Sequence, residues 1–298
     1  MPLFYADRSD RVVLALTGAD RVRFLHGMVT NDIKQLATNQ GCHAALLSQK
    51  GRFVADLVVY ARPDELWVET DRTTFDKVWE IFDHHLMADD VELVDRRADL
   101  QLFGLYAKDA ALPIAAPLYG IVEHAGVLVA GTRELGMPGL RIFGAGAPAL
   151  ASGATLLSPT ELETLRIEAG TPRYGIDMDE ERLFLEAGIA DAVSYDKGCY
   201  LGQEVVVRAQ ARGGINRRLM GLLLDGDATT PLPARGTKLA TPERPEAGYV
   251  TSATYSPTLQ RPVALGYVHK TAWTPGTIVQ LGDRTATAIV SALPLVDN

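Results

Sequence analysis

The sequence predicts an α+β protein with a separate all-β domain at its carboxyl end. Residues 1–100 mix helical patterns with strands joined by hairpin-like turns, without the regular strand–helix alternation of a parallel sheet. After about residue 214 the helical periodicity disappears, and short apolar runs such as VALGYVH alternate with turns rich in proline and glycine. We therefore expect an α+β region over residues 1–214 and a β-barrel over residues 215–298.

Individual elements follow from spacing and turn residues. Apolar residues three and four apart predict a helix within 21–36, which Gly27 could interrupt. The segment HAALLSQKGRFVADLVVYARPDELWVET predicts strands joined by hairpin turns at 50–51 and 63–64. The apolar face of TTFDKVWEIFDHHL predicts a second helix within 73–86, and a Ser-Pro-Thr start with a closing glycine predicts a third, amphipathic helix within 158–170.

Composition narrows the class of protein. The chain has 298 residues, a net charge of −8 and two cysteines, Cys42 and Cys199, far apart in sequence. The net charge argues against a general nucleic-acid binder. The cysteines form no disulfide framework, so we expect a reducing cytoplasm. The first residues match neither a signal nor a transit peptide, and no run approaches the roughly 18 apolar residues of a membrane span.

Metal ligands do not cluster in the sequence. His84 and His85 form a lone doublet without the i, i+4 spacing that places two ligands on one helix face. Two cysteines remote in sequence do not suffice for an iron–sulfur cluster, which needs several thiolates. No metal site is predicted.

The stretch DKGCYLGQE contains Cys199, and its neighbours bear on whether that thiol is reactive. Lys197 would favour the thiolate, which is the reactive form. The following EVVVRAQ fits a strand because of its three valines, and a helix because Glu204 and Arg208 stand at i and i+4. A helix would start after Gly202 and would also lower the thiol pKa. The alternative is a buried structural cysteine, the commoner fate of a free thiol.

The same region is locally basic. Between residues 197 and 218 there is one acid, Glu204, and five basic residues, which could receive a carboxylate-tailed cofactor, a phosphate backbone or an acidic partner. A solvated linker face is the alternative. The basic residues are Lys197, Arg208, Arg212, Arg217 and Arg218.

Two acids stand in apolar surroundings. Asp56 lies in GRFVADLVVY and Glu186 in LFLEAGIADAV, where a carboxylate needs a partner or a function. Acids at the edge of an apolar cleft suit a heterocycle with several N–H donors, and a carboxylate there could assist proton transfer. Surface acids on half-exposed strands are the alternative.

Several segments together resemble one family. KGCYLGQEVVVRAQARGGINRRL resembles the signature of the YgfZ-type folate-binding proteins, relatives of the glycine-cleavage T-protein, the aminomethyltransferase. RVRFLHGMVTNDI, LSQKGRFVADLVVY, LRIEAGTPRYGIDMD, LEAGIADAVSYDKG and GYVTSATYSPTLQRPVALGYV resemble the superfamily's other blocks, in the same order. The resemblance covers nearly the whole chain, and its cysteine-bearing block is the one specific to the YgfZ branch.

This resemblance implies a fold and a set of site residues. It implies two interleaved ferredoxin-like α+β subdomains in a ring, followed by a C-terminal all-β barrel, and it favours a helix for EVVVRAQ. It implies a tetrahydrofolate pocket in which Asp56 lies beside the reactive folate nitrogen. Glu186 matches a pterin-contacting glutamate, and Tyr174 and Arg208 are further expected folate contacts. The motif residues are Lys197, Gly198, Cys199, Tyr200, Gly202, Gln203 and Glu204.

The leading functional hypothesis also comes from the resemblance. It implies a folate-dependent accessory protein, monomeric and cytoplasmic, that supports assembly or repair of iron–sulfur enzymes, including the radical enzymes that thiolate transfer RNA. Cys199 would be the critical thiol, Asp56 the second catalytic candidate, and tetrahydrofolate or a derivative the cofactor. The partners would be iron–sulfur enzymes or assembly proteins.

Two alternatives remain open. The first is a tetrahydrofolate-dependent C1 transferase, an aminomethyltransferase or demethylase, in which Asp56 assists proton transfer. Two departures weaken it. Ala55 stands where the T-protein has the first of two adjacent aspartates, and T-proteins carry an aromatic–glycine–lysine–glutamate version of the motif without the cysteine. The second alternative is a binding module in which Cys199 is structural and the basic stretch docks an acidic partner.

Overall fold

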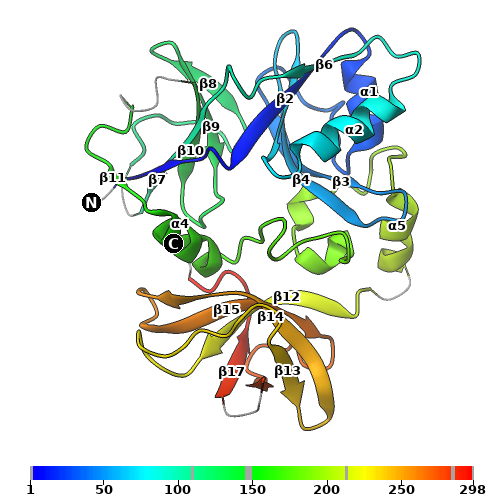
Figure 1. Cartoon of the computed structure of the whole chain (residues 1–298). Helices are drawn as coiled ribbons and strands as arrows, with labels where there is room; N and C mark the ends of the chain where they lie inside the picture. The colour runs from blue at the N-terminus through cyan, green and yellow to red at the C-terminus, as the bar shows by residue number, and fades with distance from the viewer. Residues whose placement is uncertain (1–2, 109–110, 145–149, 212–213, 283–285, 297–298) are drawn as a thin grey trace. The chain divides into compact units, whose positions relative to one another are not determined.

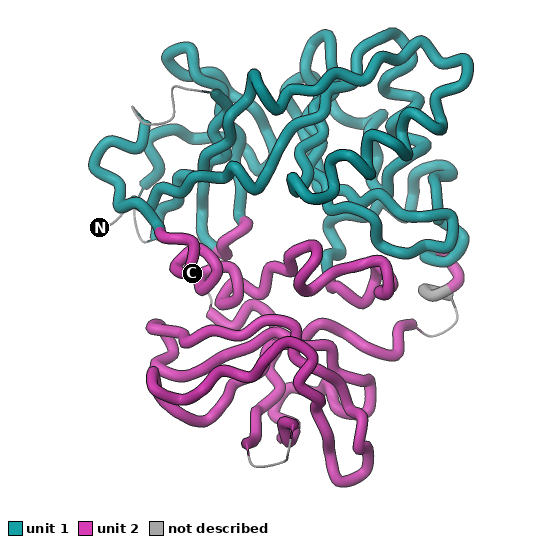
Figure 2. Tube along the Cα trace, in the orientation of Figure 1, with its two compact units in different colours: residues 1–133, 137–157, 189–206 teal, residues 134–136, 158–188, 207–298 magenta. Residues whose placement is uncertain are grey.

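The computed structural model describes residues 3–108, 111–144, 150–211, 214–282 and 286–296 (Figure 1). The chain forms two compact units that alternate along the sequence (Figure 2). The division into domains after residue 214 stays a prediction. Unit 1 comprises Met1–Arg133, Met137–Leu157 and Ile189–Val206, and unit 2 comprises Glu134–Gly136, Ser158–Gly188 and Val207–Asn298.

The first sheet of unit 1 is antiparallel and, over the described residues, has five strands in the order β3-β4-β5-β2-β6. Its apolar residues on one face form a core that the helices α1 (Arg21–Met28) and α2 (Phe75–His85) cover. The predicted hairpin turns at 50–51 and 63–64 join β3 to β4 and β4 to β5. The strands are β2 (Arg11–Thr17), β3 (Gly41–Leu47), β4 (Phe53–Ala61), β5 (Leu66–Asp71) and β6 (Glu92–Asp95).

A β-bulge in the β3–β4 hairpin decides which way Asp56 points. The register shifts between Leu46 and Leu47, so that Val54 is an extra residue on β4. Side chains alternate between the two faces of a strand. A register shift of one residue therefore places every later side chain of β4 on the face opposite to the one it would have with regular pairing. As a result Asp56 shares a face of the sheet with His43 instead of pointing away from it.

The second sheet of unit 1 has six strands in the described ranges, in the order β11-β1-β7-β10-β9-β8. Only its β1–β11 pair is parallel. Apolar residues of both sheets, among them Val13, Tyr60 and Phe143, form one buried cluster, so the two sheets pack face to face. The strands are β1 (Leu3–Asp7), β7 (Leu102–Ala107), β8 (Ile121–His124), β9 (Val127–Thr132), β10 (Gly139–Phe143) and β11 (Thr155–Leu156).

Helix α1 is shorter than its apolar spacing predicted, and it ends next to Gly27, where the sequence indicated an interruption. The pattern runs through 21–36, but the helix ends at Met28 and the backbone of Val29 is extended. Asn31 and Asp32 lie just beyond, and the Asp32 carboxylate accepts backbone N–H groups of the next turn at 3.0 and 3.3 Å. Such side chain–backbone bonds compete with the helix for the same donors and so end it.

Unit 2 consists of α4 (Pro159–Glu168), the short 3-10 helix η1 (Phe184–Ala187) and a closed barrel. The predicted start of α4 is confirmed, because Ser158 and Glu161 form a reciprocal capping box. In the part of the chain that the structure describes, six antiparallel strands close the predicted barrel in the order β12-β15-β14-β13-β16-β17. They are β12 (Arg217–Leu224), β13 (Lys238–Thr241), β14 (Arg244–Ser256), β15 (Arg261–His269), β16 (Ile278–Leu281) and β17 (Ala286–Ser291).

The returning chain of unit 1 carries the short 3-10 helix η2 (Ala190–Ala192) and the start of α5 (Gln203–Ala211). The valine-rich stretch EVVVRAQ is therefore helical, as the resemblance implied and as the spacing of Glu204 and Arg208 permitted. None of the helices among the described residues is long and apolar enough to cross a membrane.

Candidate functional site

Asp56 has the polar partners that its apolar strand required. It lies on the face of β4 that is turned toward the second sheet, and its side chain is 19% exposed. The Nε2 atom of His43 is 2.6 Å from Asp56 Oδ1, and Nη1 of Arg11 donates to Asp56 Oδ2 at 3.3 Å. The carboxylate is thus held by two cationic groups, His43 from the neighbouring strand β3 and Arg11 from β2, which lies beyond β5.

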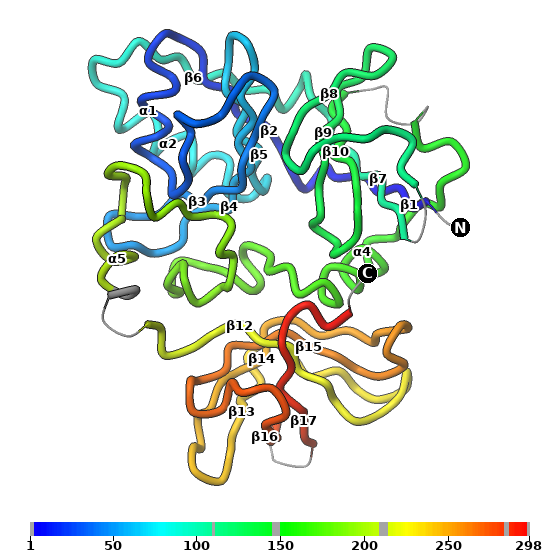
Figure 3. The backbone as a smooth tube through the Cα atoms, turned by 180° about the vertical axis from the view of Figure 1, so that it is seen from behind, coloured from blue at the N-terminus to red at the C-terminus, as the bar shows by residue number. Residues whose placement is uncertain are grey.

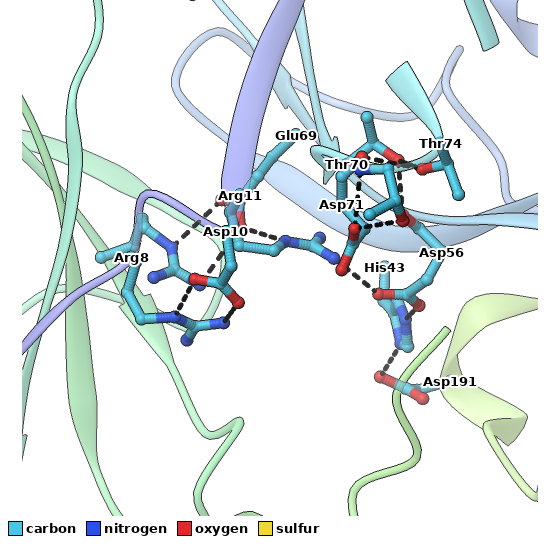
Figure 4. A network of polar contacts seen from close by, with 12 residues as sticks. Arg8, Asp10, Arg11, His43, Asp56, Glu69, Thr70, Asp71, Thr74 and Asp191 are labelled. Carbon is cyan, nitrogen blue, oxygen red and sulfur yellow. Dashed lines mark hydrogen bonds and ion pairs between the residues drawn. The ribbon is translucent and has the colours of Figure 1, made fainter. Parts of the chain in front are cut away.

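Asp191 completes this arrangement from a distant part of the sequence. Helix η2 brings its carboxylate Oδ2 to within 3.0 Å of His43 Nδ1, and Tyr119 donates to the same oxygen at 3.2 Å. The imidazole of His43 therefore bridges two carboxylates, with Asp56 on one side and Asp191 on the other (Figure 4). We call Arg11, His43, Asp56 and Asp191 the Asp56 site.

The charges of these groups reinforce one another. Burial alone would lower the pKa of His43, but the charge of Asp56 and the hydrogen bonds of both carboxylates raise it to about 10. Burial would raise the pKa of Asp56, but His43 and then Arg11 hold it below its usual value. At neutral pH the site therefore contains an imidazolium between carboxylates. A carboxylate with a lowered pKa is an anionic acceptor and a weak general base.

A buried ion-pair cluster supports Arg11 from the interior. Arg11 Nε donates to Glu69 Oε1 at 3.0 Å, and the Glu69 side chain is only 1% exposed. Arg141 from β10 donates to the same carboxylate from its Nε at 3.2 Å, and Tyr60 donates its hydroxyl at 3.2 Å. Glu69 is therefore fully engaged, which keeps the Arg11 guanidinium aimed at Asp56.

Cys199 is exposed, whereas the alternative of a structural cysteine predicts a buried thiol. It lies just before α5, and the backbone there is held tightly against the β3–β4 hairpin. Gly202 has φ +80°, and a Cβ added to it would lie 2.4 Å from Ser48 O. A Cβ on Gly51 would likewise lie 2.5 Å from Val205 Cβ. Glycine at both positions is what lets the start of α5 approach the hairpin.

Lys197 is buried. Its ammonium group does not serve the role that its sequence position indicated, which was to favour the thiolate of Cys199. Its Nζ donates to three backbone carbonyls, His26 O at 2.6 Å, Val29 O at 2.7 Å and Asn31 O at 2.7 Å. An ammonium has three protons, so none remains to donate to Cys199. Burial lowers the pKa of Lys197 to about 8, which leaves the ammonium form dominant at pH 7. We call these three bonds the Lys197 clamp.

The other motif residues have mainly local roles. The Tyr200 ring is buried, with Lys197 Nζ 5.1 Å from its centroid, and its carbonyl accepts from Gln203 N at 3.2 Å. Glu204 is exposed in the first turn of α5, where a negative charge favours the helix.

The expected folate contacts other than Asp56 lie in unit 2. The Glu186 carboxylate caps η1 by accepting a backbone N–H at 3.4 Å. Tyr174 is half-buried, and Arg208, on α5, is exposed. All three belong to a different unit from Asp56, and their role in folate binding stays a prediction. Arg212 of the basic stretch lies outside the described residues.

Sequence reasoning missed His43, Asp191, Arg11 and Glu69. The need for a partner for Asp56 was visible, and a histidine on the preceding strand was a candidate once the register was known. Nothing in the sequence marked Asp191. No group of three or more His, Cys, Asp or Glu side chains in the described ranges is arranged to hold a metal ion.

Gly202→Ala should destabilise the protein by about 3 kcal/mol, because an alanine is strained at φ +80° and its Cβ would overlap a backbone oxygen. Gly198→Ala is the matched control within the motif, because its Cβ would meet nothing closer than 4.0 Å. Chemical denaturation followed by circular dichroism measures both changes. Equal losses in the two variants would contradict this account of Gly202.

His43→Gln should destabilise the protein in a pH-dependent way. The folded-state pKa of His43, about 10, lies above its unfolded value of 6.5. Its stabilising contribution is therefore complete below pH 6.5 and is lost as the pH rises through about 10. We expect a difference in unfolding free energy of about 2 kcal/mol at pH 6 that shrinks toward pH 10.

The control for this series is His84→Gln, which changes an exposed histidine and should have little effect at any pH. Denaturation curves from pH 6 to 10 supply the measurement. A loss for His43→Gln that does not vary with pH would argue against a charged imidazolium at this position.

Comparisons with known proteins agree with the fold and the two-part sequence pattern. The model of the GCVT N-terminal domain matches residues 5–111, and that of the glycine cleavage T-protein C-terminal barrel domain matches residues 217–297. An aminomethyltransferase of Rubrobacter xylanophilus is 30% identical, over 86% of this chain and 73% of that protein. One of Thermosynechococcus vestitus is 31% identical, over 94% of this chain and 81% of that protein.

A solved structure confirms the predicted fold class. The crystal structure of glycine cleavage system aminomethyltransferase T from Bartonella henselae superposes with a TM-score of 0.86 at 20% sequence identity. The alignment covers 99% of this chain and 87% of that chain. The two domain models and the relatives at 30% identity or more show the family. The chain belongs to the glycine cleavage T-protein family.

Proposed function

We propose that this chain is a tetrahydrofolate-dependent accessory protein of the YgfZ type, which supports the assembly or repair of iron–sulfur enzymes. The observation that carries the proposal is the exposed thiol of Cys199 on a segment whose backbone is clamped in place. An exposed thiol adds little to packing, which counts against a structural cysteine. Cys42 is partly buried, and burial raises its pKa to about 12.

The Asp56 site supports the folate part of the proposal. The relatives with 30% identity or more are named aminomethyltransferases, and a reduced pterin offers several N–H donors to a carboxylate. Asp56 is partly exposed and permanently anionic at neutral pH, so it suits such donors. Ala55, which stands where the T-protein has the first of its two adjacent aspartates, is fully buried in the apolar core on the opposite face of the sheet.

Cys199→Ser should remove the supporting activity. In a bacterial strain that lacks its own counterpart of this protein, we expect the wild type to restore iron–sulfur enzyme activity and Cys199→Ser to restore at least tenfold less. Cys42→Ala, which changes the other thiol, is the matched control and should behave like the wild type. Full restoration by Cys199→Ser would refute the proposal.

A second candidate function is a tetrahydrofolate-dependent C1 transferase, and the retention of Asp56 favours it. The lowered pKa of Asp56 argues against it, because proton transfer at a folate nitrogen would need a base with a pKa closer to neutral.

Calorimetry and a turnover assay separate the two functions. We expect the wild type to bind tetrahydrofolate and Asp56→Asn to bind it at least tenfold more weakly, since the substitution removes the anionic acceptor. With an aminomethyl donor present, we expect no methylenetetrahydrofolate. Steady formation of methylenetetrahydrofolate would favour the transferase over the accessory role. Unchanged binding of tetrahydrofolate by Asp56→Asn would show that Asp56 is not part of the folate site.

A further inference from the structure

One segment of unit 1 carries both Asp191 and Cys199. We call residues 189–202 the Cys199 segment; it runs beside β3, as Figure 3 shows in yellow-green. Near its start the carbonyl of Ala192 accepts a hydrogen bond from Thr30 Oγ1 at 2.5 Å. The segment is therefore tied to the chain that follows α1.

Thr30 extends this tie to the five-stranded sheet. Its side chain is fully buried, and its Oγ1 accepts from Ala45 N of β3 at 2.8 Å while donating to Ala192. Its carbonyl accepts from Ser194 N at 3.1 Å. A displacement of the Cys199 segment relative to β3 would break these bonds together.

The far end of the segment is anchored on both sides of Cys199. The Lys197 clamp holds the chain two residues before the thiol, and Leu201 N donates to Gly27 O at 3.0 Å two residues after it. Cys199 is exposed between two fixed points. Its surroundings therefore depend on how the segment as a whole is held.

Asp191 connects this segment to the Asp56 site. Its carboxylate reaches His43 at 3.0 Å although its side chain is 58% exposed, and His43 reaches Asp56 at 2.6 Å. One imidazolium is thus shared by two carboxylates, one on the sheet and one on the segment. A change in the hydrogen bonds and ion pairs of Asp56 therefore alters the strength of the interaction between His43 and Asp191.

Ligand binding at Asp56 would make such a change. N–H groups of a ligand that donate to Asp56 use the lone pairs that accept from His43 in the free protein. The positive charge of His43 is then balanced more by Asp191, which draws the start of the segment toward β3.

We propose that Asp191 is a positioning residue that couples occupancy of the Asp56 site to the reactivity of Cys199. Ligand binding tightens the Cys199 segment and makes the thiol react more slowly. The predicted effect of the ligand rests on the proposed folate site, whereas the predicted effect of Asp191 on Cys199 in the ligand-free protein does not.

The experiment measures the rate at which Cys199 reacts with N-ethylmaleimide at pH 7, with and without tetrahydrofolate under argon. Mass spectrometry of peptides separates the modification of Cys199 from that of the partly buried Cys42. In the wild type we expect tetrahydrofolate to slow the reaction about fivefold. In Asp191→Ala we expect the ligand-free reaction to be about fivefold faster than in the wild type, and the ligand effect to disappear.

Asp196→Ala is the matched control. Asp196 lies in the same segment, is exposed, and loses the same charge on substitution. It should keep the wild-type rate and the wild-type response to tetrahydrofolate. Unfolding midpoints of both variants show whether either change loosens the protein as a whole.

The possible outcomes separate the coupling from the proposed function. If calorimetry shows that tetrahydrofolate binds but the wild-type rate stays the same or rises, the coupling is wrong and the folate site stands. If tetrahydrofolate does not bind, the folate site fails, and equal ligand-free rates for Asp191→Ala and Asp196→Ala would overturn the coupling too. A lower unfolding midpoint for Asp191→Ala with an intact ligand response would make Asp191 merely structural and would also overturn it.

Discussion

An imidazolium held between two carboxylates is the interaction on which the polar end of unit 1 depends. His43 joins three stretches of chain, namely β3, β4 and the segment that returns after residue 188. Because each buried charge has an opposite charge within hydrogen-bond distance, the site is stable beside an apolar sandwich core, where an isolated charge would be strongly destabilising. Arg11 and Glu69 extend this alternation of positive and negative side chains into the protein interior, because Arg11 pairs with both Asp56 and Glu69.

Much of the fold was predictable because local signals and the global fold agree. The turn residues at 50–51 and 63–64, the capping residues before α4 and the strand-rich texture after residue 214 each indicated the element that forms. The end of α1 was not predictable from apolar spacing, because the deciding factor is the competition of Asp32 for backbone donors.

The site was predictable only in part. An acid in an apolar strand marked Asp56, but its partner depended on a register shift that no turn residue announces. Lys197 was interpreted through its neighbour in sequence, Cys199, whereas its long side chain reaches the carbonyls at the end of α1. Helix ends leave such carbonyls without donors, and a buried ammonium supplies them, which is a tertiary effect that sequence proximity does not reveal.

The bulge at Val54 also limits how this family member can vary. Substitutions in the hairpin that keep the bulge preserve the face on which Asp56 lies. Deletion of the extra residue Val54 would restore regular pairing and still leave Asp56 opposite Ala45, on the face of His43. Regular pairing of the undeleted strand from the turn would instead place Asp56 opposite Ala44 and turn the carboxylate toward the apolar core. In this hairpin the register of the pairs beyond the bulge is therefore a stricter requirement than chain length, and an alignment gap at Val54 is compatible with the site.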